Sequence, residues 1–145
     1  MANGITQRHT PGAARLDFAK LLLRVALGVL ILLHGISKIK SGPAMIVDLV
    51  AHAGAPGVLG YLVYIGEVVA PVLLIVGLYT RPAGAIIVIN MIVAVLLAHT
   101  GDLLSMSDSG GYALELQALY LVAALVVALV GAGRYSLGGI YGRWN

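Results

Sequence analysis

Long apolar runs separated by short polar connections dominate the chain. A helix needs about 20 residues to cross roughly 30 Å of hydrocarbon, and four runs approach or reach that length. They cover residues 20–39, 58–79, 82–99 and 112–132. Each is about twice as long as a membrane β-strand and lacks its alternation of apolar and polar residues. The pattern therefore predicts an all-α integral membrane protein, a four-helix bundle.

The remaining segments complete the predicted architecture. Residues 1–19 form a polar leader, which we expect to be mobile, the bundle occupies residues 20–139, and residues 140–145 form a C-terminal tail. A cleaved signal peptide is the competing interpretation of the first run, but the run is too long and no clean small-residue cleavage pattern follows it. Residues 41–57 mix apolar residues with an acid and a histidine, which predicts a short interfacial helix in the first outer loop.

Composition and charge agree with this architecture. Hydrophobic residues make up 60% of the chain and charged residues 10%, and the mean hydropathy is +0.99. The net charge of +3 follows the positive-inside rule if both termini are cytoplasmic, because only Lys38 and Lys40 then lie outside. The basic residues on or near the cytoplasmic side are then Arg8, Arg15, Lys20, Arg24, Arg81, Arg134 and Arg143. They form no dense run, so we expect the lipid bilayer, and no nucleic acid, as a partner.

Four ionisable residues of the predicted spans lie between the midplane and the outer surface of the membrane. Glu67 is the deepest, at about 14 Å, where a charged side chain costs about 2.5 to 3.5 kcal/mol on insertion scales. His34, His99 and Glu115 lie nearer the outer surface. We predict that these four residues, one from each span, line a single outward-opening polar pocket and are its catalytic groups.

Helical periodicity of about 100° per residue predicts which faces point inward. The third span is ambiguous, because Asn90 and His99 point in opposite directions. We favour His99 for the pocket and interpret Asn90 as an interhelical hydrogen-bonding residue. The predicted inward stripes are Arg24, Gly28, Ile31, Gly35 and Lys38 on the first span, Gly60, Tyr64, Glu67, Pro71, Leu74 and Leu78 on the second, and Gly111, Glu115, Leu119, Val122, Val126 and Gly133 on the fourth.

Several of these residues also have purely structural interpretations. Arg24, Lys38 and Lys40 can extend to lipid headgroups as membrane anchors. Glu115 and His99 lie close enough to the interface to be hydrated or to cap a helix. Glycines on the first span permit either close packing within the chain or a homo-oligomer.

Short motifs spread over the chain resemble the DoxX family of small bacterial membrane proteins. They are the HG at 34–35 followed by Lys38, the GAP at 54–56, Glu67 ten residues before GLYTR at 77–81, and GRYSL at 133–137. The likeness covers residues 16–139. Family members usually carry an acidic residue directly after tyrosine-serine-leucine, where this chain has Gly138, so a role for that acid does not transfer.

This resemblance implies a setting for the protein. It suggests a multi-pass protein of the bacterial inner, or cytoplasmic, membrane. Some relatives are linked to quinone-coupled oxidation of sulfur compounds, and others to redox complexes of oxidative-stress defence.

The absence of cysteine limits the redox chemistry of the chain itself. It excludes a thiol relay, an internal disulfide and an all-cysteine iron–sulfur centre, so electrons need a bound carrier or a partner protein. Quinone is the natural carrier, because its reduction consumes protons that a buried carboxylate with nearby histidines can deliver. We expect no haem or metal, since the helices carry no histidine pair at four-residue spacing.

These observations predict a membrane redox subunit that handles quinone and protons with a redox partner protein. Glu67 would hold the proton, and His34 and His99 would exchange it with the outer surface. Quinone would be bound by Lys38, Tyr64 and Arg24. The alternative is a non-enzymatic membrane bundle that transports or chaperones a small solute or a client protein in the same cavity.

Overall fold

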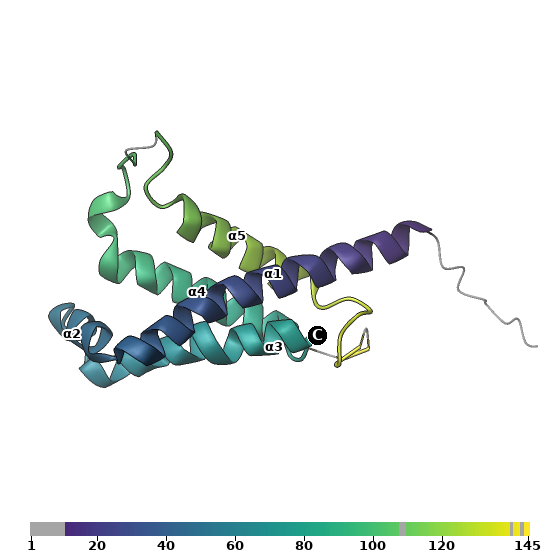
Figure 1. Ribbon diagram of the computed structural model, residues 1–145, viewed down its shortest axis with the longest axis horizontal. Helices are drawn as coiled ribbons and strands as arrows, with labels where there is room; N and C mark the ends of the chain where they lie inside the picture. Colours follow the sequence, from purple (N-terminus) through teal and green to yellow (C-terminus); the bar gives the residue numbers. More distant parts are fainter. Residues whose placement is uncertain (1–10, 108–109, 140, 143) are drawn as a thin grey trace, which may run out of the picture.

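The computed structural model describes residues 11–107, 110–139, 141–142 and 144–145 of the chain, and over these residues it is helical, with no β-strand (Figure 1). The elements are α1 (Pro11–Ser41), α2 (Ala44–His52), the 3₁₀ helix η1 (Gly57–Leu62), the π-helix η2 (Ile65–Val69), α3 (Ala70–Val76), α4 (Thr80–Ala98), the 3₁₀ helix η3 (Thr100–Asp102) and α5 (Glu115–Val130).

The predicted runs fold as helices, with shifted boundaries. α1 begins at Pro11, so residues 11–19 of the predicted leader are helical, and residues 1–10 lie outside the described part of the chain. Residues 57–76 and α4 are each long and apolar enough to cross a membrane, whereas α5 has only 16 residues. The short helix predicted within residues 41–57 is confirmed as α2.

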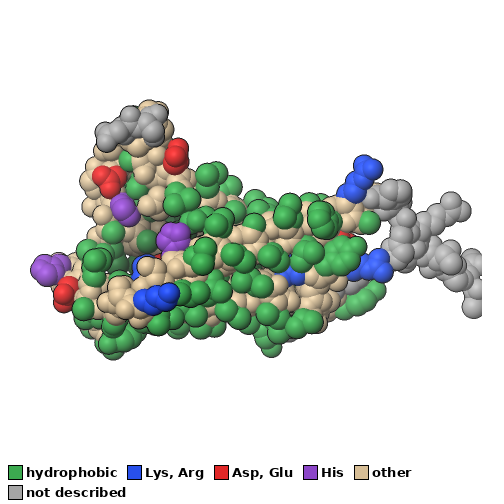
Figure 2. Space-filling model, in the orientation of Figure 1, with side chains coloured by type: hydrophobic (Ala, Val, Ile, Leu, Met, Phe, Trp, Pro, Cys, Tyr) green, Lys and Arg blue, Asp and Glu red, His purple; other side chains and the backbone are tan. Residues whose placement is uncertain are grey.

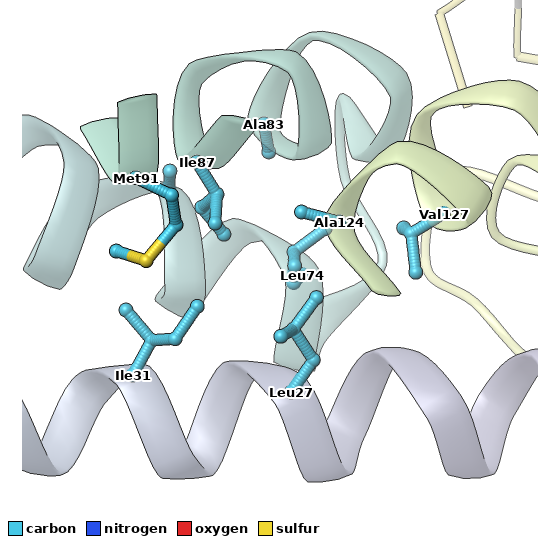
Figure 3. Close-up of a cluster of buried hydrophobic side chains, with 9 residues drawn as sticks. Leu27, Ile31, Leu74, Ala83, Ile87, Met91, Ala124 and Val127 are labelled. Carbon is cyan, nitrogen blue, oxygen red and sulfur yellow. The ribbon is translucent and has the colours of Figure 1, made fainter. Parts of the chain in front are cut away.

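Four helical segments, α1, α3, α4 and α5, meet around one apolar core (Figure 3). The core consists of Leu27, Ile31, Ala70, Leu74, Ala83, Ile87, Met91, Ala124 and Val127. Many large apolar side chains instead point outward, among them Leu22, Leu33, Ile89, Leu96 and Leu129. Such an apolar exterior is expected of helices that pack among lipid chains.

The predicted inward face of the fourth span is wrong. Leu119 and Val122 are exposed, and α5 buries Ala124 and Val127 instead. Gly84 of α4 explains this choice, because a Cβ atom placed there would lie 2.9 Å from the carbonyl oxygen of Ala124. Small residues that let two backbones approach closely decide the packed face, and the acid at the start of the helix does not.

Two glycines of α1 determine how closely it approaches the second apolar segment. A Cβ atom at Gly28 would lie 2.9 Å from the carbonyl oxygen of Pro71, and one at Gly35 would overlap the carbonyl oxygen of Glu67. The predicted inward face of α1 is therefore confirmed. The chain's own backbone fills the glycine face that the sequence also offered for self-association.

The second apolar segment is widened where it carries Glu67. In η2 the amide of Ala70 donates a hydrogen bond to the carbonyl of Ile65, five residues earlier. Pro71 has no N–H group, so it cannot supply the ordinary α-helical hydrogen bond to the Glu67 carbonyl. A proline one turn after the acid thus coincides with a π-turn at the acid.

Arg24 is 2% exposed and binds backbone carbonyls at the end of α3. Its Nη1 atom donates to the carbonyl oxygens of Leu74 at 2.5 Å and Ile75 at 2.8 Å, and its Nη2 atom donates to that of Tyr135. The last carbonyls of a helix have no intrahelical donor, so a buried guanidinium satisfies them. Arg24 therefore ties α1 to α3 and to the segment after α5.

The C-terminal tail packs back against the same end of the bundle. The Asn145 side chain accepts a hydrogen bond from Thr80 Oγ1 at 2.9 Å and donates to Ser136 Oγ at 3.1 Å and to the Gly139 carbonyl at 2.9 Å. The tail thereby connects the start of α4 to the segment after α5.

Replacing Arg24 by Met should destabilise the protein, because it leaves buried carbonyls without donors while keeping a side chain of similar length. Each unsatisfied group costs about 1 to 3 kcal/mol, so we expect a loss of about 2 to 4 kcal/mol in the free energy of unfolding. Denaturation of the purified protein in detergent measures it. Arg15→Met, at an exposed position of the same helix, is the control. Equal losses in the two variants would contradict the role assigned to Arg24.

Replacing Gly35 by Ala should separate α1 from η2, because the new methyl group meets the Glu67 carbonyl. Overpacking of this kind costs about 1 to 3 kcal/mol. The matched control is Gly12→Ala in the same helix, where a Cβ atom would meet nothing within 4 Å. Thermal unfolding of both variants tests the contact, and an unchanged Gly35→Ala variant would exclude it.

Candidate functional site

The centre of the candidate site is an ion pair between the half-buried Lys38 of α1 and the buried Glu67 of η2, called here the Lys38–Glu67 pair. The Glu67 side chain is 4% exposed, and its Oε1 atom accepts a hydrogen bond from Lys38 Nζ. Asn90 Nδ2 of α4 donates to the same oxygen at 3.4 Å. Three elements therefore converge on one carboxylate, as a buried charge requires if it is to be compensated.

The second oxygen of this carboxylate is different. Oε2 of Glu67 is buried and has no hydrogen-bond partner among the described residues. A buried acceptor without a donor costs about 1 to 3 kcal/mol, so it marks a position where a proton or a ligand group would be stabilised.

Lys38 reaches Glu67 from the surface of the bundle. Its side chain is 34% exposed, which fits a long apolar stem that spans from the surface to the buried acid. The hydroxyl group of Tyr64 donates a hydrogen bond to the Lys38 carbonyl at 3.4 Å. Tyr64 therefore contacts the backbone that carries the lysine.

A small cavity of about 150 Å³ adjoins the pair and is called here the small polar cavity, because six of its ten lining residues carry polar groups. The histidine rings at its edge are held by neighbours: His34 packs edge-to-face on Tyr120 with centroids 5.9 Å apart, and His99 Nδ1 lies 3.1 Å from Asp102 Oδ2. A polar space of this volume can hold several water molecules. Its lining is Ile31, His34, Lys38, Glu67, Met91, Ala94, His99, Leu116, Gln117 and Tyr120.

A second, larger cavity of about 720 Å³ is an apolar groove between α2, η1, η2 and α4. Four residues, Lys38, Glu67, Ala94 and His99, line both the groove and the small polar cavity. The Lys38–Glu67 pair therefore lies at the junction of a polar space and an apolar one. Figure 2 shows histidine, acidic and basic side chains at the end of the molecule where α2 lies, whereas the surface along the helices is mostly apolar.

Most of the predicted site residues come together. His34, Lys38, Glu67 and His99 line the small polar cavity, and Tyr64 contacts the backbone of Lys38. Lys38 supplies the buried Glu67 with a partner of opposite charge.

Two predicted site residues lie elsewhere. Glu115 is exposed at the first position of α5 and lines neither cavity, because the packing of α5 on Gly84 turns this position outward. Arg24 is buried among carbonyls at the end of α3, more than three helical turns along α1 from Lys38, and lines neither cavity. Its partners are backbone atoms, which side-chain patterns do not reveal.

The third span contributes both of its polar residues, although the sequence favoured only one. Asn90 binds Glu67, and Asn90 and His99 both line the apolar groove, because the groove follows α4 along several turns and His99 lies just beyond the helix end. Gln117 and Tyr120, which line the small cavity, were not predicted. Their polar groups on the first two turns of α5 were the available signal.

Among the described residues, no group of three or more histidine, cysteine or acidic side chains is arranged to hold a metal ion. The polar groups that line the groove include the Lys38 ammonium, the Asn90 amide and the Glu67 carboxylate. This donor and acceptor set suits an uncharged organic group with carbonyl oxygens.

Comparison with known proteins gives one family and no individual relative. No curated protein and no solved structure matches the chain. The model of the DoxX family matches residues 19–100, which is more than half of the chain. The matched region contains Lys38, Glu67, Asn90 and His99, and it includes every residue that lines the apolar groove. The chain is therefore a member of the DoxX family of membrane proteins.

Proposed function

We propose that the protein is a membrane redox subunit that binds a lipid-soluble quinone beside the Lys38–Glu67 pair and works with a partner protein that carries the substrate chemistry. The observation that supports this most directly is the Glu67 carboxylate, which lines both the small polar cavity and the apolar groove and whose buried Oε2 atom has no hydrogen-bond partner among the described residues. The substrate chemistry of the partner protein would be the oxidation of a sulfur compound or a reaction of oxidative-stress defence.

The residues present fit a quinone. Its carbonyl oxygens need hydrogen-bond donors, which Lys38 and Asn90 offer, and its apolar body needs apolar walls, which the groove offers. A bound quinone supplies a redox couple whose reduction takes up protons. The protein's contribution is to hold and move those protons.

Glu67 holds a proton at its free oxygen, and Lys38 compensates the charge when the proton leaves. Imidazole rings bind and release protons near neutral pH, so His34 and His99 connect the small polar cavity with the outside. The contact between His99 and Asp102 orients the His99 ring. Tyr64 supports the backbone at Lys38, and Arg24 and Glu115 have no part in this arrangement.

The same proposal includes four spans with both termini in the cytoplasm of a bacterial cell, in the inner membrane. With 31 residues, α1 extends about 46 Å and can cross alone, whereas α5 extends about 24 Å and needs its flanking residues. The bases Arg15, Lys20, Arg81 and Arg134 lie near the start of α1, the start of α4 or beyond the end of α5. The positive-inside rule favours that end as cytoplasmic, so the Lys38–Glu67 pair lies in the outer half.

A function of another class has one observation in its favour. The apolar groove is several times larger than the polar cavity, as expected of a bundle that carries an apolar solute without redox chemistry. Mass spectrometry of the gently extracted protein separates the two, because a carrier would travel with a solute or a client protein and without quinone.

Replacing Glu67 by Gln should lower quinone-dependent turnover of the native complex by about 10²-fold or more, because an amide cannot hold and release the proton. The control is Asp48→Asn, an exposed acid of α2 that lines neither cavity, and it should keep the native rate. Thermal unfolding of both variants checks that each is folded. An unchanged rate in a folded Glu67→Gln variant would refute the proposal.

A further inference from the structure

The apolar groove opens on the lateral surface of the bundle. Three of its lining residues are well exposed: Ile65 is 43%, Ile89 62% and Val93 44% accessible. In a membrane this side of the helices faces lipid chains, so the groove is accessible sideways.

We propose that the apolar groove holds the hydrocarbon tail of the ligand whose polar head meets the Lys38–Glu67 pair. The ligand is then a long-tailed amphiphile that enters laterally from the lipid, and not a small water-soluble redox compound that enters through the polar cavity. The inference deepens the proposed function and rests on it for the nature of the head.

The distribution of polar groups supports this assignment. Lys38, Glu67, Asn90 and His99 are the polar side chains of the groove, and every other lining residue is apolar or glycine. Lys38, Glu67 and His99 also line the small polar cavity, so they mark the side of the groove that adjoins this cavity. Polar groups on one side and apolar walls elsewhere complement a molecule with a polar head and an apolar tail.

The two volumes support it independently. Pockets that enclose organic ligands measure about 300 to 1,000 Å³, a range that includes the groove at about 720 Å³ and excludes the small cavity at about 150 Å³. A ring-sized head beside Lys38 and Glu67 would fill only part of the groove. A hydrocarbon tail attached to that head would fill the rest.

The wall formed by α2 is fixed by the chain itself. Val50 of α2 is buried, and Gly60 of η1 lies so close to α2 that a Cβ atom there would be 3.1 Å from the Val47 backbone. On the other side Gly66 packs directly against the Asn90 side chain, which brings that amide to Glu67. Contacts within the chain therefore fix two walls of the groove.

Replacing Val93 by Trp tests the inference, since the indole fills the groove from an exposed position that does not line the small polar cavity. The probes are a benzoquinone with a decyl tail and the same benzoquinone without a tail, titrated into the full chain in nanodiscs and counted by native mass spectrometry. We expect the native chain to bind the tailed quinone at least about tenfold more tightly, and Val93→Trp to remove that preference. The matched control is Val122→Trp on α5, which is exposed and lines neither cavity.

The outcomes separate the tail from the head. Equal affinity of the native chain for the two quinones, or an undiminished preference in Val93→Trp, would overturn the inference. If neither quinone binds, the proposed function fails, and decanol decides the inference: decanol binding that Val93→Trp removes supports it, and no decanol binding overturns it. If Val93→Trp unfolds at a lower temperature than Val122→Trp, then Ile89→Trp, at a more exposed position of the same wall, takes its place.

Discussion

A charged carboxylate inside an apolar bundle is the constraint on which the site depends. Moving an ion out of water costs several kcal/mol, and attraction to a partner offsets that cost only at close range. Here the partner, Lys38, is on α1, and this helix must pack closely on the second apolar segment for the lysine to reach Glu67. Gly35 makes this possible, because its missing side chain lets α1 rest on the Glu67 carbonyl one turn before the lysine. Gly35 and Lys38 thus act on the same residue. Gly35 packs against the Glu67 backbone, and Lys38 binds the Glu67 carboxylate.

The local backbone gives Glu67 a second constraint. Pro71 removes one helical donor, and the chain widens into η2 at the acid. A widened turn changes the direction of the side chain relative to a regular helix, and it places Glu67 where both α1 and α4 supply donors. One oxygen receives both donors and the other receives none, so the carboxylate is stabilised and still has a free position for a proton or a ligand.

The helices and the inward faces of the first two segments could be predicted because their signals are local. Apolar length predicts a span, and glycines aligned with a charged residue predict a packed face. The face of α5 could not be predicted this way, because that helix is apolar on all sides and its packing depends on Gly84 of α4. The groove could not be predicted from the sequence either, since it exists only between elements that are distant in sequence. Asn90 was interpreted correctly as an interhelical hydrogen-bonding residue, but its acceptor required the fold.

The contact made by Arg24 has a consequence for sequence variation. Its acceptors are main-chain oxygens at positions 74, 75 and 135, and every amino acid presents such an oxygen. Side chains at these positions can therefore change freely, as far as this contact is concerned, while the guanidinium keeps its partners. A sequence comparison that searches for paired changes would find no partner of the arginine at these three positions, although the arginine fastens three parts of the chain.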